Sequence, residues 1–452
     1  MFHKNGNGNG NGNQENGGET LVVSTHPRKF LFISWEGLGG DLAWHIKKEG
    51  NEVKIYIKEQ YGNDVYDGFL EKIDDWKQYI DWADIIVFDD TGFGYQADSL
   101  RNAAKLVIGG SSYTDRIEED REFGQLEITK VGMLTIPHWE FGNFDAAIEF
   151  IKTNPGRYVW KSSGGATPYA LEDMVFLGRE EDGRDIIEVL EHNKTAWAKK
   201  IKKFQLQKFV AGVEVAVGVY FNGEDFMYPI NVNFEHKKLF PGNLGPYTGE
   251  MGSLTYWCAP NRIFTLTLAK MKDKLKEAGY AGFFYINCIA NSRGVYPLEF
   301  TSRFVYPNIS IQIEGALIDW GGFLYSLAQK QPFDLRVKRG FQVGAVIAVP
   351  PFPYIEKTEF EIYRDLSLIF KKQNLDGFHI GDLKFVDGDW RLAGESGYVM
   401  VVTGSGTTAE EARRQMYNRI QNVMLQNMFY RTDIGSRWSV ESDKLQTWGY
   451  LS

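Results

Sequence analysis

The chain has 452 residues, enough for about three domains with sizeable hydrophobic cores. Its formal net charge of −9 has the wrong sign for a protein that grips nucleic acid with its whole surface. Its two cysteines, Cys258 and Cys288, exclude a disulfide scaffold and a thiolate zinc site. No run of about 18 apolar residues is present, and the first residues lack the apolar core of a signal peptide. These features predict a cytoplasmic protein with no nucleic-acid or membrane partner.

The N-terminal part begins with a segment that offers nothing to bury. Residues 5–18 read NGNGNGNGNQENGG, and such alternation predicts a disordered Asn/Gly-rich tail over residues 1–27. Apolar strands are then expected at 29–33, 53–57, 84–88 and 106–108, with helical stretches between them. This alternation is typical of parallel βαβ units, so we expect an open α/β domain over residues 28–125.

The middle and end of the chain show a different pattern. Strands are expected at 158–161, 205–210, 214–221, 282–290 and 295–300, and the turn Asn222-Gly223 indicates a hairpin. This pattern favours an α+β region with antiparallel strands. We divide it into a small subdomain over 126–204 and a larger one over 205–335. A small β-rich domain over 336–435 and a tail over 436–452 follow.

The turn after the first strand carries Gly37, Gly39 and Gly40. The spacing is GxGG rather than the GxGxxG of dinucleotide-binding turns, and the second strand does not end in the expected acidic residue. A Rossmann oxidoreductase is therefore the least favoured hypothesis. A tight strand–helix turn near a ligand explains the glycines equally well.

Side chains that suit a metal ion and a phosphate lie later in the chain. Glu299, Thr301 and Arg303 alternate along an expected strand, so a carboxylate, a hydroxyl and a guanidinium share one face. Magnesium and phosphate suit that set, although a surface-exposed edge strand explains it too. Lys237 leads into a Gly-rich loop at 245–252, and Lys161 ends a strand before Gly164-Gly165. Such positions offer cations and backbone N–H groups to an anion.

Four short motifs carry a resemblance to a known family. They read EHK at 235–237, GPYTGEMG at 245–252, LEFTSRFVYPN at 298–308 and FHIG at 378–381. Together they resemble the DHK, GPNTGGMG, LEFNxRFGDPE and FHAG motifs of the glycinamide ribonucleotide synthetases (phosphoribosylamine–glycine ligases), within the ATP-grasp superfamily. The order holds over about residues 28–430. The resemblance implies an α/β and α+β multi-domain protein: an open α/β N-terminal domain, an ATP-grasp core of two subdomains and a small β-rich C-terminal domain.

The resemblance also implies an activity. ATP would phosphorylate a carboxylate, and an amine would attack the resulting acyl phosphate to form an amide, with release of ADP and phosphate. This is a C–N ligase reaction of purine biosynthesis in the family. The implied cofactors are ATP and Mg²⁺ or Mn²⁺. The implied partners are small molecules, namely an amino acid such as glycine and an amine, and the implied assembly is a monomer or homodimer.

The resemblance assigns roles residue by residue. The ATP-binding residues would be Arg121, Lys161, Gln207, Lys208, Phe209, Val210 and Glu214. The metal ligands would be Glu299, Thr301 and Asn287, with Asn287 on the preceding strand and opposite Glu299 if the hairpin is tight. The catalytic groups would be Lys237 and Arg303. The substrate-binding residues would be Gly37, Asp89, Asp90, His236, Gly245, Pro246, Thr248 and Gly249.

The sequence also departs from the family pattern. Residues 36–44 read EGLGGDLAW where the family has GGREHALAW, and the family's GLAAGKGV loop is reduced to residues 164–167. Thr301 and Asn287 lower the negative charge expected at the metal site, which keeps open a catalytically reduced ATP-binding relative with a regulatory role. Glu36, Asp89 and Asp90 would repel a phosphate, so we expect phosphoribosylamine to be a poor substrate and a neutral or cationic amine a better one.

Overall fold

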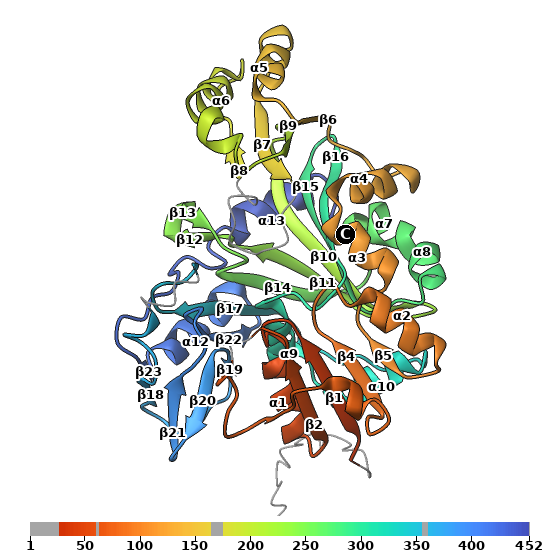
Figure 1. Ribbon diagram of the computed structural model, residues 1–452, viewed down its shortest axis with the longest axis vertical. Helices are drawn as coiled ribbons and strands as arrows, with labels where there is room; N and C mark the ends of the chain where they lie inside the picture. Colours follow the sequence, from red (N-terminus) through yellow and green to blue (C-terminus); the bar gives the residue numbers. More distant parts are fainter. Residues whose placement is uncertain (1–26, 60–62, 164–174, 355–359, 452) are drawn as a thin grey trace, which may run out of the picture.

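A computed structural model describes residues 27–59, 63–163, 175–354 and 360–451. The expected N-terminal tail and the Gly-rich loop at 164–167 therefore lie outside the described residues. An N-terminal sheet, a large central sheet and a small C-terminal sheet form the body, and a small subdomain (residues 138–208) projects from one end of it (Figure 1).

The N-terminal sheet has five parallel strands in the order β3-β2-β1-β4-β5. The strands are β1 (Lys29–Ser34), β2 (Glu52–Ile57), β3 (Glu71–Lys72), β4 (Ile85–Phe88) and β5 (Val107–Ile108). The helices are α1 (Gly40–Lys48), α2 (Gly94–Asn102), α3 (Ser112–Glu119) and α4 (Arg121–Lys130), with a short 3₁₀ turn, η2 (Trp76–Tyr79). The four expected strands are confirmed because each is a buried apolar run. Only the two-residue β3, which has no such run, was not expected.

The small subdomain has its own four-stranded antiparallel sheet, in the order β6-β9-β7-β8. Its elements are β6 (His138–Phe141), α5 (Phe144–Thr153), β7 (Tyr158–Ser163), β8 (Val175–Leu177), α6 (Arg184–Trp197) and β9 (Lys203–Lys208). Trp160 is fully buried, and its ring stacks on Trp197 at 4.7 Å between ring centroids. The subdomain thus has a hydrophobic core separate from that of the body.

The central sheet has eight antiparallel strands in the order β16-β15-β10-β11-β14-β17-β22-β19. They are β10 (Val213–Asn222), β11 (Phe226–Glu235), β14 (Gly252–Cys258), β15 (Ala281–Asn291), β16 (Gly294–Thr301), β17 (Phe341–Ala348), β19 (Phe378–Ile380) and β22 (Tyr398–Gly406). A two-stranded arm, β12 (Lys238–Phe240) and β13 (Leu244–Tyr247), with the short turn η4 (Pro241–Asn243) between its strands, extends from the region between β11 and β14.

The C-terminal part is continuous with this sheet. Its strands β17, β19 and β22 extend the central sheet, and a second, four-stranded sheet has the order β20-β21-β18-β23. The latter strands are β18 (Ser367–Phe370), β20 (Leu383–Val386), β21 (Asp389–Leu392) and β23 (Val423–Met424). The remaining helical segments are α7 (Arg262–Leu266), η5 (Leu268–Met271), α8 (Lys272–Glu277), α9 (Asn308–Gly315), α10 (Trp320–Ala328) and α12 (Ala409–Ile420).

The end of the chain differs from the sequence prediction. Where only a tail was expected, residues Trp438–Thr447 form a helix, α13, that packs on the central sheet. Trp438 lies against the rings of Phe234 and Phe341 at 5.1 and 5.0 Å, which explains why this segment is fixed. Across the described parts of the chain, no helix has the length and apolar character needed to cross a membrane.

The separate core of the small subdomain makes its stability testable by itself. Trp160→Ala should lower the free energy of unfolding of this subdomain by about 3–5 kcal/mol, because it removes a fully buried indole. Denaturant unfolding should show an earlier transition for the subdomain and an unchanged transition for the body. The control is Leu177→Ala in the same sheet, at a side chain 44% exposed. A single transition shifted as a whole would show that the two parts do not unfold separately.

Candidate active site

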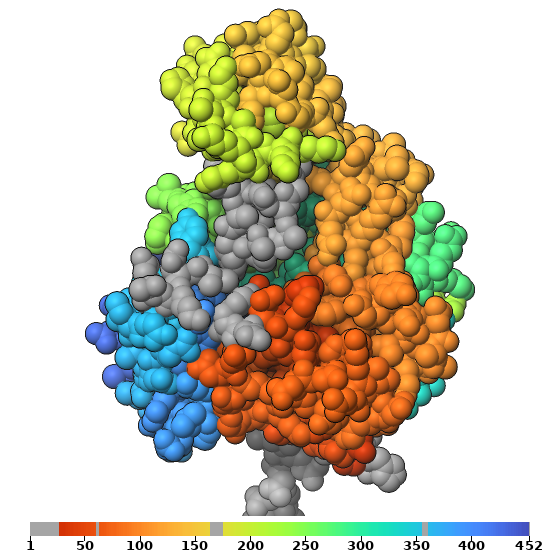
Figure 2. Space-filling model, viewed as in Figure 1, coloured from red at the N-terminus to blue at the C-terminus, as the bar shows by residue number. Residues whose placement is uncertain are grey.

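Candidate residues from five separate segments meet where the small subdomain joins the central sheet. Glu214 lies near the start of β10, Glu299 on β16, and Lys237 directly after β11. Lys161 comes from β7 of the small subdomain and Arg121 from the start of α4. In the space-filling view this region is a hollow between the small subdomain and the N-terminal part, with residues in the colour of β15 and β16 at its floor (Figure 2).

Lys237 is the centre of this group. Its Nζ lies 3.2 Å from Glu299 Oε1, 3.3 Å from Glu235 Oε2 and 3.7 Å from Glu214 Oε1. Burial opposes its charge, but these three carboxylates raise the pKa of Lys237 well above its usual value. Lys237 is therefore a permanent cation held among three carboxylates.

Of the expected metal residues, Glu299 contacts Lys237 and Asn287 contacts Glu299. Asn287 on β15 pairs with Glu299 on β16, as predicted for a tight hairpin, and its Nδ2 lies 3.4 Å from Glu299 Oε1. Lys237, followed by Lys161 and Arg121, lowers the pKa of Glu299 to about 2, so the carboxylate is ionised. Its side chain is 53% exposed towards the hollow. Thr301 ends the same strand, two residues further along.

These residues fit a hard divalent cation. Asn287 Oδ1 is buried and has no hydrogen-bond partner among the described residues, so it is available as a ligand beside Glu299. Within the described ranges, no group of three or more His, Cys, Asp or Glu side chains could hold a metal ion alone. Mg²⁺ commonly uses one or two carboxylates together with substrate phosphates, and this donor set suits that arrangement.

Two further cations face the same space. Burial and the nearby Arg121 guanidinium lower the pKa of Lys161 to about 8, while Glu299 and Glu214 act in the opposite direction. Arg121 Nη1 is buried and finds no partner among the residues that the structure describes. An orphaned guanidinium N–H beside a lysine of lowered pKa is the environment that a bound anion would complete.

The segment expected to bind adenine connects the two parts. Gln207 and Lys208 end β9, and Phe209 and Val210 lead from it towards β10. The N–H groups of Lys208 and Phe209 donate to Pro137 O and Arg157 O at 2.8 and 2.9 Å. These two groups are therefore not available for a ligand in this arrangement.

The Gly-rich loop is tied to Lys237. Thr248 donates from both its N–H and its hydroxyl to the Lys237 carbonyl, each at 2.8 Å. Gly245 has a φ of +80°, a conformation that favours glycine. Gly245 and Pro246 lie in β13 and Gly252 begins β14, so the loop expected at 245–252 is shorter and runs from Thr248 through Gly249 to residue 251. This connection fixes the loop relative to the cation in front of it.

His236 does not face the hollow. Its side chain is 1% exposed, and its Nε2 accepts a hydrogen bond of 2.9 Å from the Gly435 N–H. Burial, followed by Arg437 and Arg431, lowers the pKa of His236 to about 3. His236 is therefore neutral and anchors the C-terminal segment. In this arrangement it does not contact the space expected to hold the substrate.

The prediction that Arg303 continues the face of Glu299 and Thr301 is wrong, because β16 ends at Thr301. The guanidinium turns to the N-terminal domain, where Nε lies 3.0 Å from both Glu118 Oε1 and Asp90 Oδ1. Glu118 also accepts from the Ser302 N–H at 2.7 Å. Arg303 thus joins the sheet that carries Glu299 and Asn287 to the N-terminal domain.

The two N-terminal loops lie at the carboxyl ends of β1 and β4, as expected for an open α/β sheet, and the loop after β4 reaches Arg303 through Asp90. Asp89 is fully buried, and its Oδ2 accepts from the Gly39 N–H at 2.7 Å. Burial and Asp90 raise the pKa of Asp89 to about 7. A Cβ on Gly39 would lie 2.4 Å from Asp89 Oδ2, and Gly37 has a φ of +91°. Asp89 therefore holds the turn after β1 in shape, whereas Asp90 pairs with Arg303.

Sequence reasoning missed three groups at this site. Tyr285 donates its hydroxyl to Glu235, Glu250 is a buried carboxyl beside it, and Glu118 pairs with Arg303. Burial and Glu235 raise the pKa of Glu250 well above its usual value. Glu250 occupies a position where the family motif has Gly, and this difference in the sequence could have indicated a carboxyl group at the site. Glu118 lies 185 residues from Arg303, and nothing in the sequence indicated their pairing.

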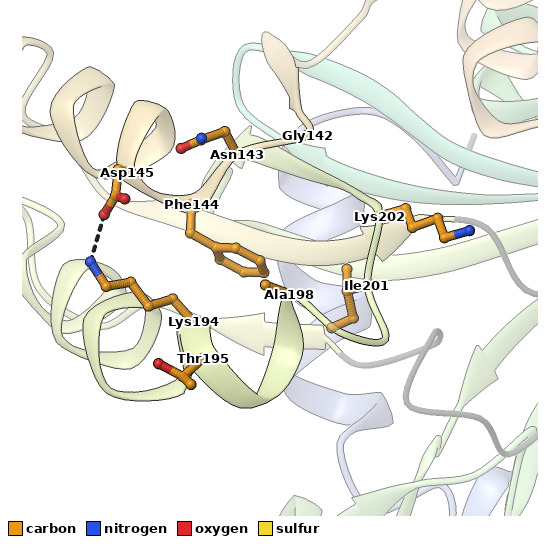
Figure 3. Close-up of a pocket in the computed structure, with 9 residues that line it drawn as sticks. All are labelled: Gly142, Asn143, Phe144, Asp145, Lys194, Thr195, Ala198, Ile201 and Lys202. Atoms are coloured by element: carbon orange, nitrogen blue, oxygen red, sulfur yellow. Dashed lines mark hydrogen bonds and ion pairs between the residues drawn. The ribbon is translucent and has the colours of Figure 1, made fainter.

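A separate hollow lies in the small subdomain, away from these residues. It measures about 480 Å³ and lies in the small subdomain, where Phe144 on α5 and Ala198 after α6 line it and the Lys194–Asp145 ion pair spans it at 2.7 Å (Figure 3). None of the candidate residues lines it. The candidate active site is therefore defined by the side chains that meet around Lys237, and this hollow is not part of it.

Comparisons with known proteins show what this chain is similar to. The family model for the phosphoribosylglycinamide synthetase ATP-grasp (A) domain matches residues 120–309, and the model for the C domain of the same enzyme matches residues 342–437. The chain belongs to the ATP-grasp superfamily and resembles the phosphoribosylamine–glycine ligases.

Individual relatives have low sequence identity to this chain, but the matches cover most of its length. A phosphoribosylamine–glycine ligase from Neisseria meningitidis is 25% identical over 90% of this chain and 99% of its own. One from Streptococcus suis is 24% identical over 75% of this chain and 80% of its own. The crystal structure of the Thermotoga maritima ligase covers 90% of this chain and all of its own, with a TM-score of 0.67 and 22% identity. The expected fold class is confirmed.

Glu299 gives the first test of the ATP-grasp site. Glu299→Gln should reduce ADP formation to background, because the variant loses the only carboxylate proposed to hold the metal. Two carboxylates remain on Lys237, so the melting temperature should change little. Glu277→Gln, at a side chain 73% exposed on α8, is the matched control. Parental ADP formation by Glu299→Gln would remove Glu299 from the metal site.

Lys161 gives a test with a pH dependence. Because the pKa of Lys161 is lowered to about 8, its charge is lost as pH rises through that value, and ATP affinity should fall between pH 7 and 9. Phosphate contact would raise this pKa, so binding near pH 8 should take up protons. Calorimetry in buffers of different ionisation enthalpy measures both effects. Lys161→Met should bind ATP more weakly by about 1–3 kcal/mol and lose the proton uptake. Unchanged affinity and uptake would exclude Lys161 from the site.

Proposed function

We propose that this protein is an ATP-dependent carboxylate–amine ligase of the phosphoribosylamine–glycine ligase type. A carboxylate oxygen of the acid attacks the γ-phosphorus of ATP, and the bond to the ADP oxygen breaks. The amine nitrogen then attacks the acyl carbon, the C–O bond to phosphate breaks, and the nitrogen loses a proton. The products are an amide, ADP and phosphate.

The observation that carries the proposal is the convergence of Lys237, Lys161 and Arg121 around Glu299 and Asn287. The two orphaned atoms, Arg121 Nη1 and Asn287 Oδ1, support a phosphate and a metal ion in the space between them. A bound Mg²⁺ or Mn²⁺ would be held by Glu299 and Asn287 and would neutralise phosphate charge. Lys237 would move from Glu299 to the transferred phosphoryl group, because the metal then takes the carboxylate.

The ribose, the adenine and the acid would bind to residues around this group. Glu214 would accept from ribose hydroxyls, and the 207–210 segment would read adenine through backbone groups other than the N–H of Lys208 and Phe209. The acid would lie between Lys237 and the 245–249 segment, with the Gly249 N–H as a donor to its carboxylate. Glycine or another small amino acid fits this position. We place the enzyme in the cytoplasm, as a monomer or homodimer.

The amine would bind between the N-terminal loops and Arg303. Arg303 is paired with both Asp90 and Glu118, so its charge is more than offset. Lys384 and Arg364, the cations around Asp64 nearby, are also paired with acidic groups. The net negative charge of these described residues would repel a phosphate, whereas it would not repel a neutral or cationic amine. We therefore propose an amine substrate that lacks the phosphate.

The test supplies ATP, Mg²⁺ and glycine with either fresh phosphoribosylamine or a panel of non-phosphorylated amines, and follows ADP and amide. We expect turnover with a non-phosphorylated amine and poor turnover with phosphoribosylamine. Efficient turnover at micromolar phosphoribosylamine, within the usual enzyme range, would overturn the altered substrate and leave the ligase reaction standing. ATP binding without ADP formation for any acid–amine pair would contradict the ligase itself.

A further inference from the structure

The helix α13 lies beyond the residues matched by the C-domain family model, which end at 437. It is nevertheless packed on β10 and β15, the strands that carry Glu214 and Asn287 (Figure 1). Trp438, at its first turn, is fixed between Phe234, Tyr256 and Phe341 by ring contacts of 5.0 to 5.5 Å. The helix is therefore part of the structure behind the nucleotide residues.

Arg437, directly before α13, reaches the strand end that positions Lys237. Its Nη2 donates to the Glu235 carbonyl at 2.9 Å, and its Nη1 lies 3.2 Å from Glu441 Oε1, one turn along the helix. The Gly435 N–H donates to His236 at 2.9 Å. The two residues before Lys237 are thus each held by the segment leading into α13.

A second arginine holds the residue after Lys237. Arg431 is 1% exposed, and its Nη1 donates to the Lys238 carbonyl at 2.8 Å and to Asn243 Oδ1 at 3.1 Å. Asp433 pairs with the same guanidinium and accepts from the Gly242 N–H at 2.9 Å. Lys237 is therefore bracketed on both sides by anchors from residues 431–441.

Glu441 connects this anchor to the ribose end of the site. Its side chain is 13% exposed, and burial raises its pKa, while Arg437 acts in the opposite direction and Glu214 adds to the rise. Glu441 thus lies close enough to Glu214 for their charges to interact. The same ion pair that orients Arg437 also borders the carboxylate proposed to hold ribose hydroxyls.

We propose that residues 431–441 are a positioning element of the nucleotide site, in which Arg437, oriented by Glu441, fixes the main chain that carries Lys237. This inference rests on the proposed role of Lys237 at the transferred phosphoryl group. Arg437 does not touch the nucleotide and acts through the Glu235 carbonyl. Loss of the Arg437 side chain should therefore weaken the binding of ligands that contact Lys237 more than the binding of ligands that do not.

Calorimetry of the full chain with Mg²⁺ and either ATP or ADP tests the proposal. Arg437→Gln should weaken ATP binding about tenfold, as for the loss of charge-assisted hydrogen bonds, and ADP binding less than threefold, because ADP lacks the γ-phosphoryl group. Arg437→Lys, which keeps a charged donor, should recover part of the loss. Lys444→Gln, at an exposed residue of α13, should bind both nucleotides like the parent.

The outcomes separate this inference from the proposed function. If the parent binds no ATP, the proposed function fails and this inference with it. If the parent binds ATP and Arg437→Gln binds it equally well, or loses ATP and ADP to the same extent, only the positioning role is overturned. Should Arg437→Gln fail to fold, Glu441→Gln keeps the shape and weakens the orientation of Arg437. It should then show the same preferential loss of ATP, and equal loss or none would reject the proposal.

Discussion

The structure of the site depends on the ion pairs around Lys237. A buried ammonium is costly unless it is paired, and three carboxylates within 3.7 Å offset that cost. With Lys161 and Arg121 nearby, basic side chains face Glu299, Glu235 and Glu214, so their charges partly offset one another without a ligand. Adding phosphate alone would disturb this balance, whereas in the proposed reaction a divalent cation bound with the phosphate would let Lys237 exchange a carboxylate for a phosphoryl oxygen. Metal and nucleotide binding are therefore expected to reinforce each other.

The continuous central sheet explains how distant segments meet at this point. Glu299, Asn287 and Glu214 lie on the adjacent strands β16, β15 and β10, and their register places Asn287 opposite Glu299. The C-terminal strands extend the same sheet, which brings residues 431–441 to the back of the Lys237 segment. Arg303 ties the edge of the sheet to the N-terminal loops. The nucleotide side and the proposed amine side are thus parts of one framework.

Much of this arrangement could be predicted from the sequence because the signals were local. The apolar runs of β1, β2, β4 and β5 predicted a parallel sheet, and the hairpin of β15 and β16 predicted the Asn287–Glu299 pair. Contacts between distant residues gave no such signal. Arg303 was expected on a strand that ends at Thr301, and its partner Glu118 comes from a different domain. His236 reads as a polar site residue, yet burial and the Gly435 N–H make it an anchor. The tail prediction failed because Trp438 and Leu445 pack on a sheet that the local pattern does not reveal.

The most direct test of the account is a crystal structure of the protein with Mn²⁺ and a non-hydrolysable ATP analogue, with the ion located by anomalous scattering. We expect the ion at about 2.0–2.3 Å from Glu299 and the phosphates, as for a hard cation with oxygen ligands, with Asn287 Oδ1 beside it. Lys237 Nζ should then lie within hydrogen-bond distance of the γ-phosphate instead of Glu299. A nucleotide bound away from β10 and β16, or Lys237 still paired with Glu299 in the complex, would contradict the account.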